Sequence, residues 1–142
     1  MERTLALIKP RAFKENLTGP ILNDICQAGF RILSIKTLKM NKDDTESFYS
    51  IHKGKPFYKP LVEYMSSGKI VVFVLSKENA VNDFRKLLGP TDPHEAKKGS
   101  LREKYGLNTR KNAIHGSDSV ENAEKEINFF FAAYETTMIS SI

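Results

Sequence analysis

Cysteine is nearly absent from this sequence, because Cys26 is the only one and no intrachain disulfide can form. A chain without disulfides fits a reducing compartment. Since Ile21, Leu22 and Ile25 lie close to it in the sequence, Cys26 is predicted to be a buried small hydrophobe. There is also no run of about 18 apolar residues that would form a membrane-spanning helix, and no charged segment followed by an apolar segment that would form a signal peptide. We therefore expect a cytoplasmic protein without a membrane partner.

Several common motifs of catalysis and cofactor binding are missing as well. The chain has no G-x-x-x-x-G-K-[ST] phosphate loop, no G-x-G-x-x-G turn and no G-x-S-x-G nucleophile turn. It also lacks C-x-x-C and H-E-x-x-H, and its three histidines, His52, His94 and His115, are not spaced as metal ligands. A transition metal held by the protein is therefore not expected.

The composition is that of an ordinary globular protein. The chain has 142 residues, of which 40% are hydrophobic and 27% charged, so a single domain over residues 1–142 with a real hydrophobic core is expected. A net charge of +5 is compatible with nucleic acid, a membrane surface or phosphate-bearing small molecules. No block of five or six like charges marks a nucleic-acid tail, so a solvated, lysine-rich surface explains the charge most simply.

Apolar patterning predicts strands and helices that interleave along the chain. Strands are expected at residues 4–8, 30–40 and 69–76, with a short one ending near residue 115. Helices are expected at residues 18–28, 43–52, 57–66, 77–88 and 120–131, and Thr18 is expected to cap the first of them. Residues 89–111 are predicted to form a long irregular loop, functional or disordered. This order predicts an α+β fold, a ferredoxin-like β-α-β-β-α-β sandwich with a four-stranded antiparallel sheet, an inserted helical hairpin and a long loop.

The last predicted helix has two alternative caps and one apolar face. Either Ser119 or Asp118 is expected to cap its start. Its buried stripe is expected to comprise Val120, Ala123, Ile127, Phe130 and Tyr134. Residues 136–142 are expected to be either a loosely held tail or a segment that packs against another subunit.

One histidine lies in an unusual setting between the last predicted strand and the last predicted helix. The small apolar pair Ala113 and Ile114 leads into His115, and a glycine and three residues with side-chain oxygens follow. His115 is therefore expected at a strand end, beside a tight turn and near a helix N-terminus, where dipoles favour anions. A lone histidine is more often an ordinary surface or core residue, so other residues must give it a chemical role.

Several cationic or polar residues near the ends of predicted elements supply that role. Lys9 ends the first strand, Arg85 lies on the helix that leads into the long loop, and Thr91 and Arg102 lie within the loop. Each alone is most simply a solvated residue, but together they suit a polyphosphate. Phosphate-binding groups beside a neutral imidazole suggest phosphoryl transfer with histidine as a covalent nucleophile. Such a reaction is ping-pong, and Mg²⁺ would arrive with the nucleotide.

The motif from Asn112 to Asp118 resembles the N-x-x-H-G-S-D signature of nucleoside diphosphate kinases. The similarity extends to the first strand (residues 4–10), to the hairpin (residues 48–58) and to the long loop, where R-x-x-x-G-x-T-x-P and G-x-x-R occur in order. The ordered matches cover essentially the whole chain.

The resemblance implies a ferredoxin-like homo-oligomer, a tetramer or hexamer, that transfers a γ-phosphate between nucleotides with Mg²⁺. It makes His115 the phosphorylated nucleophile and assigns Ser117 and Glu126 to steady the imidazole. Glu126 lies two helical turns after Ser119, on the same helix face. The phosphates would be held by Lys9, Tyr49, Arg85, Thr91 and Arg102; the ribose hydroxyls by Lys9 and Asn112; and the base would stack on Phe57 beside Leu61. From the pattern alone, an exposed helix residue is favoured for Glu126, whereas Tyr49 and Phe57 fit core aromatics and site residues equally well.

Four positions depart from the pattern of that family. Arg11 stands where aspartate is common, and Lys98 replaces a loop proline, which would loosen a loop that the family uses for subunit contacts. Thr109 replaces an apolar residue opposite the stacked base, and Arg110 follows it where glycine is common. The departures at Thr109 and Arg110 concern the affinity for the base rather than the phosphate chemistry.

Two other functions compete with an active kinase. A catalytically weak nucleotide-binding relative is less favoured, because His115, Ser117 and Glu126 are all intact. A nucleic-acid-binding ferredoxin-like domain would stack bases on aromatic residues of the sheet. Here Phe73 lies in an all-apolar run and no K/R-G-F/Y-G-F pattern occurs, so nucleic acid is not expected as the primary partner.

Overall fold

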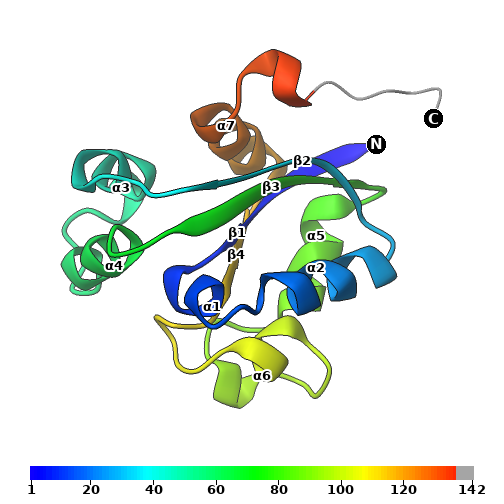
Figure 1. Cartoon of the computed structure of the whole chain (residues 1–142), viewed down its shortest axis with the longest axis horizontal. Coiled ribbons are helices and arrows are strands. Elements are labelled where there is room, and N and C mark those ends of the chain that lie inside the picture. Colours follow the sequence, from blue (N-terminus) through cyan, green and yellow to red (C-terminus); the bar gives the residue numbers. More distant parts are fainter. Residues whose placement is uncertain (137–142) are drawn as a thin grey trace.

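A computed structural model describes residues 1–136, and its centre is a four-stranded antiparallel sheet with the order β2-β3-β1-β4 (Figure 1). The strands are β1 (Glu2–Ile8), β2 (Arg31–Leu38), β3 (Ile70–Lys77) and β4 (Ile114–Gly116). The fold class predicted from the sequence, a ferredoxin-like α+β sandwich, is confirmed. The helices predicted between the strands are present, with bounds that differ by a few residues.

Seven α-helices within the described residues surround this sheet. They are α1 (Pro10–Lys14), α2 (Thr18–Gln27), α3 (Lys42–Phe48), α4 (Tyr58–Met65), α5 (Ala80–Leu88), α6 (Leu101–Tyr105) and α7 (Val120–Phe130), with 3-10 turns at Ser50–His52, Pro93–Glu95 and Ala133–Thr136. Helix α1 is absent from the sequence prediction, which treats Pro10 only as the end of a strand. Pro10 is instead the first helical residue, where its fixed φ and missing N–H are tolerated.

The two faces of the sheet pack against different helices, as strand alternation requires. On β1, Ala6 and Ile8 face the cluster that contains α2 and α5, whereas Leu5 and Leu7 face the cluster that contains α4 and α7. Strand β3 alternates in the same way, so its whole apolar run is buried. A buried apolar side chain contributes about 1.5–3 kcal/mol, which makes β1 and β3 the stable frame that carries the neighbouring strand β4.

Helix α2 corrects two predictions. Ile21 and Ile25 are fully buried one turn apart, whereas Cys26 is exposed. Cys26 is rotated by about 100° from Ile25 around the helix, and only a narrow stripe of α2 touches the sheet. The predicted cap at Thr18 is also wrong, because Thr18 is already helical and Leu17 precedes it in a helical conformation. The short link from α1 leaves no extended residue to act as a cap.

Helix α7 follows the predicted bounds, but its buried face is narrower than predicted. Ser119 caps it by accepting a 3.0 Å hydrogen bond from the backbone N–H three positions later. Ala123 and Ile127 are fully buried, whereas Val120 is 51% exposed. Tyr134 is 82% exposed and lies beyond the end of the helix. Val120 is the first helical residue, and no element packs over it closely enough to bury it.

The segment predicted as an irregular loop, residues 89–111, contains a 3-10 turn and helix α6. The Tyr105 hydroxyl donates a 2.6 Å hydrogen bond to Asp24, which attaches α6 to α2. Gly106 ends the helix so closely that a Cβ there would lie 2.6 Å from the Arg102 carbonyl oxygen. Arg102 therefore lies on an ordered element rather than in an irregular loop.

No helix within residues 1–136 has both the length and the apolar composition needed to cross a membrane. Of the predicted C-terminal tail, Thr136 is buried and accepts hydrogen bonds from Arg3. Residues 137–142 lie outside the described part of the chain.

Candidate active site

A cleft of about 740 Å³ brings together residues that are far apart in the sequence. Among its lining residues are His115 and all seven residues that the sequence analysis assigned to nucleotide binding: Lys9, Tyr49, Phe57, Arg85, Thr91, Arg102 and Asn112. A second cavity, of about 720 Å³, lies beside α1 and contains none of the predicted site residues. The larger cleft is therefore the candidate active site.

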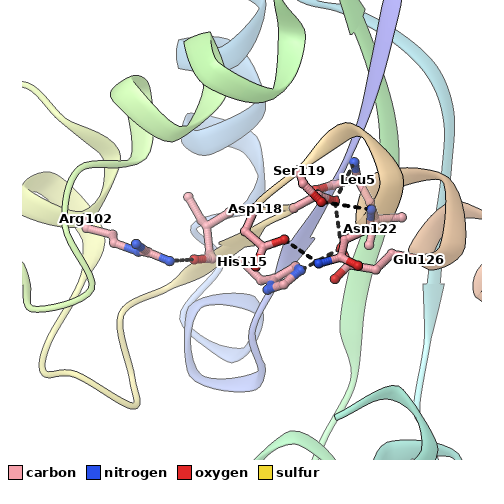
Figure 2. Close-up of polar contacts among 9 residues, drawn as sticks. Leu5, Arg102, His115, Asp118, Ser119, Asn122 and Glu126 are labelled. Atoms are coloured by element: carbon pink, nitrogen blue, oxygen red, sulfur yellow. Dashed lines mark hydrogen bonds and ion pairs between the residues drawn. The ribbon is translucent and has the colours of Figure 1, made fainter. Parts of the chain in front are cut away.

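His115 is held on β4 by a carboxylate from α7. Its Nε2 atom lies 2.9 Å from Oε1 of Glu126, and the two side chains are 21% and 20% exposed (Figure 2). Because a carboxylate can only accept, Nε2 donates the proton in this contact, and Nδ1, the other ring nitrogen, is not engaged by Glu126. The imidazole ring also packs edge-on against Phe48, with centroids 5.8 Å apart. His115 is thus fixed in one orientation, with one ring nitrogen free.

Ser117 and Glu126 do not line the cleft but stand behind the imidazole. The Ser117 hydroxyl donates to the same Oε1 atom of Glu126 at 2.6 Å. It also accepts a 3.3 Å hydrogen bond from the backbone N–H of Leu5 on β1. Ser117 is 1% exposed, so this network links β1, β4 and α7 in a buried setting where hydrogen bonds fix geometry well.

The backbone just before His115 adopts a rare conformation. Ala113 has φ of +77°, and the N–H of Ile114 bonds to the carbonyl of Asn112 at 3.0 Å. The Ala113 carbonyl accepts a 2.8 Å hydrogen bond from the N–H of Lys9 at the end of β1. Such strain persists only where surrounding contacts enforce it, commonly at functional sites. No feature of the sequence indicates a positive φ at an alanine.

Asn112 connects the loops that border the cleft. Its amide nitrogen donates to the carbonyls of Thr91 at 3.1 Å and Thr109 at 3.0 Å. Its amide oxygen is buried and has no hydrogen-bond partner among residues 1–136. A buried orphan acceptor on the wall of a cleft suits a donor group of a ligand, such as a sugar hydroxyl.

Lys9 is buried at the end of β1, where a charge is costly. Its ammonium group donates to the Arg110 carbonyl at 3.4 Å. Burial, and secondly the charge of Arg102, lower the pKa of Lys9 to about 7. Among the described residues that line the cleft, none is Asp or Glu. An anion in the cleft would therefore relieve the repulsion and favour the charged lysine.

Arg102 supports the floor of the cleft. Its two terminal nitrogens each donate at 3.0 Å, one to the carbonyl of Gly89 and the other to that of Ile114. Figure 2 shows the bond from Arg102 to the backbone beside His115. Burial, followed by the charge of Arg85, lowers the pKa of Arg102 to about 10. Arg85 is exposed and forms no ion pair within residues 1–136. The two guanidinium groups thus differ. That of Arg102 is hydrogen-bonded to backbone carbonyls, whereas that of Arg85 is exposed to solvent.

Aromatic residues from the segment between α3 and α4, the helical hairpin, also line the cleft. Phe57 is 45% exposed, and its ring lies 5.2 Å from the ring of His52. Tyr49 lines the cleft but is only 6% exposed, and burial raises the pKa of its phenol well above the usual range. Tyr49 is therefore mostly buried, as a core aromatic would be, although it also borders the cleft. Phe57, in contrast, presents an open face on which a base can stack.

Two lining residues, His52 and Asn108, were not predicted as site residues, and Arg110 was noted only as a departure from the family pattern. His52 lies on the same hairpin as Tyr49 and Phe57, which is the signal that could have found it. Burial lowers its pKa, and the charges of Lys55 and His115 lower it further.

Nearly the whole chain is similar to proteins of one known family. The family model described as "Nucleoside diphosphate kinase" matches residues 2–136. A protein of that name from Nitratiruptor sp. is 50% identical over 135 residues, covering 95% of this chain and 98% of the relative. Another, from Chloroherpeton thalassium, is 49% identical and covers 95% of this chain and 96% of the relative.

Solved structures agree with the fold. The Aquifex aeolicus nucleoside diphosphate kinase superposes with a TM-score of 0.93 at 42% identity, covering 96% of this chain and 99% of that one. A halophilic nucleoside diphosphate kinase from Halobacterium salinarum, determined in complex with CDP, has a TM-score of 0.93 at 30% identity and covers 98% of this chain and 93% of that one.

Proposed function

Because this chain belongs to the nucleoside diphosphate kinase family, we propose that it transfers the γ-phosphate of a nucleoside triphosphate to a nucleoside diphosphate through a phosphohistidine on His115. As a member of that family it is a phosphotransferase and its substrates are nucleotides. One observation carries the proposed mechanism: Glu126 occupies Nε2 of His115 and leaves Nδ1 free on a residue that lines the cleft.

The proposed reaction has two in-line transfers. The lone pair of Nδ1 attacks the γ-phosphorus, an N–P bond forms, and the bond to the β-phosphate oxygen breaks as the nucleoside diphosphate leaves. The ring then carries a positive charge, which the Glu126 carboxylate stabilises at Nε2. A terminal phosphate oxygen of a second nucleoside diphosphate attacks the phosphorus, and the N–P bond breaks. These steps give ping-pong kinetics.

The polar lining of the cleft supports the roles proposed for the other residues. Lys9, Arg85, Thr91 and Arg102 would bind the phosphates, since no carboxylate of the cleft competes for their charge. The orphan oxygen of Asn112 would accept from a ribose hydroxyl, and Lys9, which lines the same cleft, would also reach the ribose. Tyr49 would border the phosphates, and Phe57 would stack on the base.

The same lining does not fit a resident metal ion. Within residues 1–136 there is no group of three or more His, Cys, Asp and Glu side chains that could hold one. Mg²⁺ prefers oxygen ligands and usually keeps several waters while binding substrate phosphates. We therefore propose that Mg²⁺ enters with the nucleotide, bound by phosphate oxygens rather than by protein side chains.

The edge of the sheet supports a homo-oligomer, either a tetramer or a hexamer. In the part of the chain that the structure describes, strand β2 pairs on one side only, and Ile35 on it is 47% exposed. An unpaired edge with an exposed large apolar residue is suited to pairing with another copy. Light scattering after size exclusion distinguishes the two assemblies. The single cysteine supports a cytoplasmic location.

Within residues 1–136, the sheet does not offer the exposed aromatic residues that the nucleic-acid alternative needs. Phe73 on β3 is fully buried, and helices cover both faces of the sheet. Bases therefore have no exposed sheet aromatic on which to stack.

The test uses ATP labelled at the γ-phosphate. The wild-type protein should form an acid-labile phosphoenzyme that loses its label on addition of GDP, and His115→Ala should form none. His94→Ala is the matched control, because His94 is exposed and lies outside the cleft. Absence of a phosphoenzyme in the wild type would overturn the proposal.

A further inference from the structure

We propose that Arg110 makes this enzyme prefer nucleotides whose base presents an oxo group at its edge, guanine above all. The inference rests on the proposed function, because it concerns the base of the same nucleotide. Arg110 stands on the loop before β4 and lines the cleft together with Asn108 and Thr109.

The loop that carries Arg110 is held in one shape. The Asn108 side-chain oxygen accepts from the backbone N–H groups of Arg110 at 3.1 Å and Lys111 at 2.8 Å. The N–H of Leu107 bonds to the Lys111 carbonyl at 2.8 Å, and the Arg110 carbonyl accepts from Lys9. A wall that is fixed before binding loses little entropy when it contacts a base.

The free polar groups on this wall are mainly hydrogen-bond donors. The Arg110 side chain is exposed and makes no hydrogen bond or ion pair with any residue from 1 to 136. The amide oxygen of Asn108 is already used twice, so only its NH₂ group is free. No Asp or Glu of the cleft supplies an acceptor. Among the side chains of this wall, only the Thr109 hydroxyl can both donate and accept.

The cleft has a phosphate end and a base end. Arg85, Thr91 and Arg102 also line an adjoining pocket of about 140 Å³, which places the phosphate-binding groups at that end. Phe57 comes from the hairpin on another wall. A nucleotide with its terminal phosphate at His115 and its base on Phe57 would place the base between Phe57 and the loop of Thr109, and Arg110, next in the chain, would then meet the edge of the base.

Base chemistry then decides the preference. Guanine presents O6 and N7 as adjacent acceptors, which match two N–H groups of one guanidinium. Adenine places an N6 donor where guanine has O6, and the Asn108 oxygen that could otherwise accept from it is engaged by the backbone. Among pyrimidines, uracil offers the O4 acceptor and cytosine the N4 donor. GDP should therefore be preferred over ADP, and UDP over CDP.

Equilibrium binding by calorimetry tests this preference without depending on turnover. The wild type should bind GDP about tenfold more tightly than ADP, since a bidentate contact is worth about 1–3 kcal/mol. The 7-deaza analogue of GDP should lose most of that advantage, because it lacks one acceptor. Arg110→Gly should reduce the ratio to about two or less, and Arg110→Lys should give an intermediate value. Lys111→Ala is the matched control and should keep the wild-type ratio, because Lys111 does not line the cleft.

Equal binding of GDP and ADP by the wild type, or an unchanged ratio in Arg110→Gly, would overturn the inference. Failure of the proposed function has a different signature, since it is the absence of a phosphoenzyme and leaves the binding ratios measurable.

Discussion

The Nε2 atom of His115 lies 2.9 Å from Oε1 of Glu126, and this contact fixes which ring nitrogen is available for chemistry. Ser117 donates to the same oxygen at 2.6 Å, so the carboxylate is itself held in place. The strand that carries the histidine and the helix that carries the glutamate are thereby joined through one atom.

Removing the carboxylate should reduce turnover more than binding. In Glu126→Ala the imidazole loses its orienting partner, and kcat should fall about 10- to 100-fold with little change in KM. Glu126→Gln keeps an acceptor oxygen and should be less impaired. Glu121→Ala is the control on the same helix, because the side chain of Glu121 is 81% exposed, and it should leave kcat unchanged. An equal loss in both alanine variants would contradict the positioning role.

Substitution of the two cleft arginines should have different effects: Arg102→Ala should lower both stability and nucleotide binding, whereas Arg85→Ala should lower nucleotide binding alone. Arg102→Ala leaves the carbonyls of Gly89 and Ile114 without their donors, so the free energy of unfolding should fall by about 1–3 kcal/mol and KM should rise. Arg85→Ala removes an exposed side chain and should raise KM with a change in stability below about 0.5 kcal/mol. Urea denaturation and steady-state kinetics measure both quantities. Equal stability losses in the two variants would refute this distinction.

Lys9 should make the stability of the empty enzyme depend on pH. Its pKa is about 7 when folded, against an ordinary value of 10.5, so between these values the unfolded chain holds a proton that the folded chain lacks. The free energy of unfolding should therefore rise with pH across that window, by at most about 1.4 kcal/mol per pH unit. Lys9→Met should lose this slope in denaturation experiments. A wild-type slope of zero from pH 7 to pH 9 would show that Lys9 titrates normally.

Nucleotide binding should reverse that shift. Phosphate beside Lys9 favours the charged ammonium, so binding at pH 8 should take up a proton. Calorimetry in two buffers with different ionisation enthalpies measures this uptake, and Lys9→Met should show less of it.

Gly116 should be intolerant of even one methyl group. An added Cβ would lie 2.7 Å from a Leu88 methyl carbon and 2.8 Å from the Phe84 ring. Gly116→Ala should therefore lose about 1–3 kcal/mol of stability, because the core is close-packed, and kcat should fall as β4 shifts. Gly19→Ala meets nothing within 4 Å and lies in α2, so it should be neutral or stabilising by up to about 1 kcal/mol. Thermal melts of the two variants compare them directly.

The sequence predicted the frame of the fold because strong patterns have strong physical causes. The apolar run of β3 predicted a central strand, and this strand is buried on both faces. Helix α6 has five residues, too few to show a helical period, so its region was predicted to be irregular. Cys26 and Val120 lie at the margins of their helices' apolar faces, where neighbouring elements rather than periodicity decide burial.

For the candidate site, the sequence predicted which residues take part but not how they are arranged. The family resemblance named most of the residues that line the cleft, but not His52 or Asn108. Spacing from Ser119 indicated that Glu126 could reach His115. The positive φ at Ala113, the backbone bonds of Arg102 and the depressed pKa of Lys9 depend on contacts between distant segments. Such contacts leave no local pattern in a sequence.

Phosphorus NMR of the phosphoenzyme tests the central claim most directly, because it distinguishes phosphate on Nδ1 from phosphate on Nε2. With Glu126 hydrogen-bonded to Nε2, the spectrum of the wild-type phosphoenzyme should show a single phosphohistidine with phosphorus bonded to Nδ1. The signal should be absent from His115→Ala. A phosphate on Nε2, or a phosphoenzyme that survives in His115→Ala, would contradict the account.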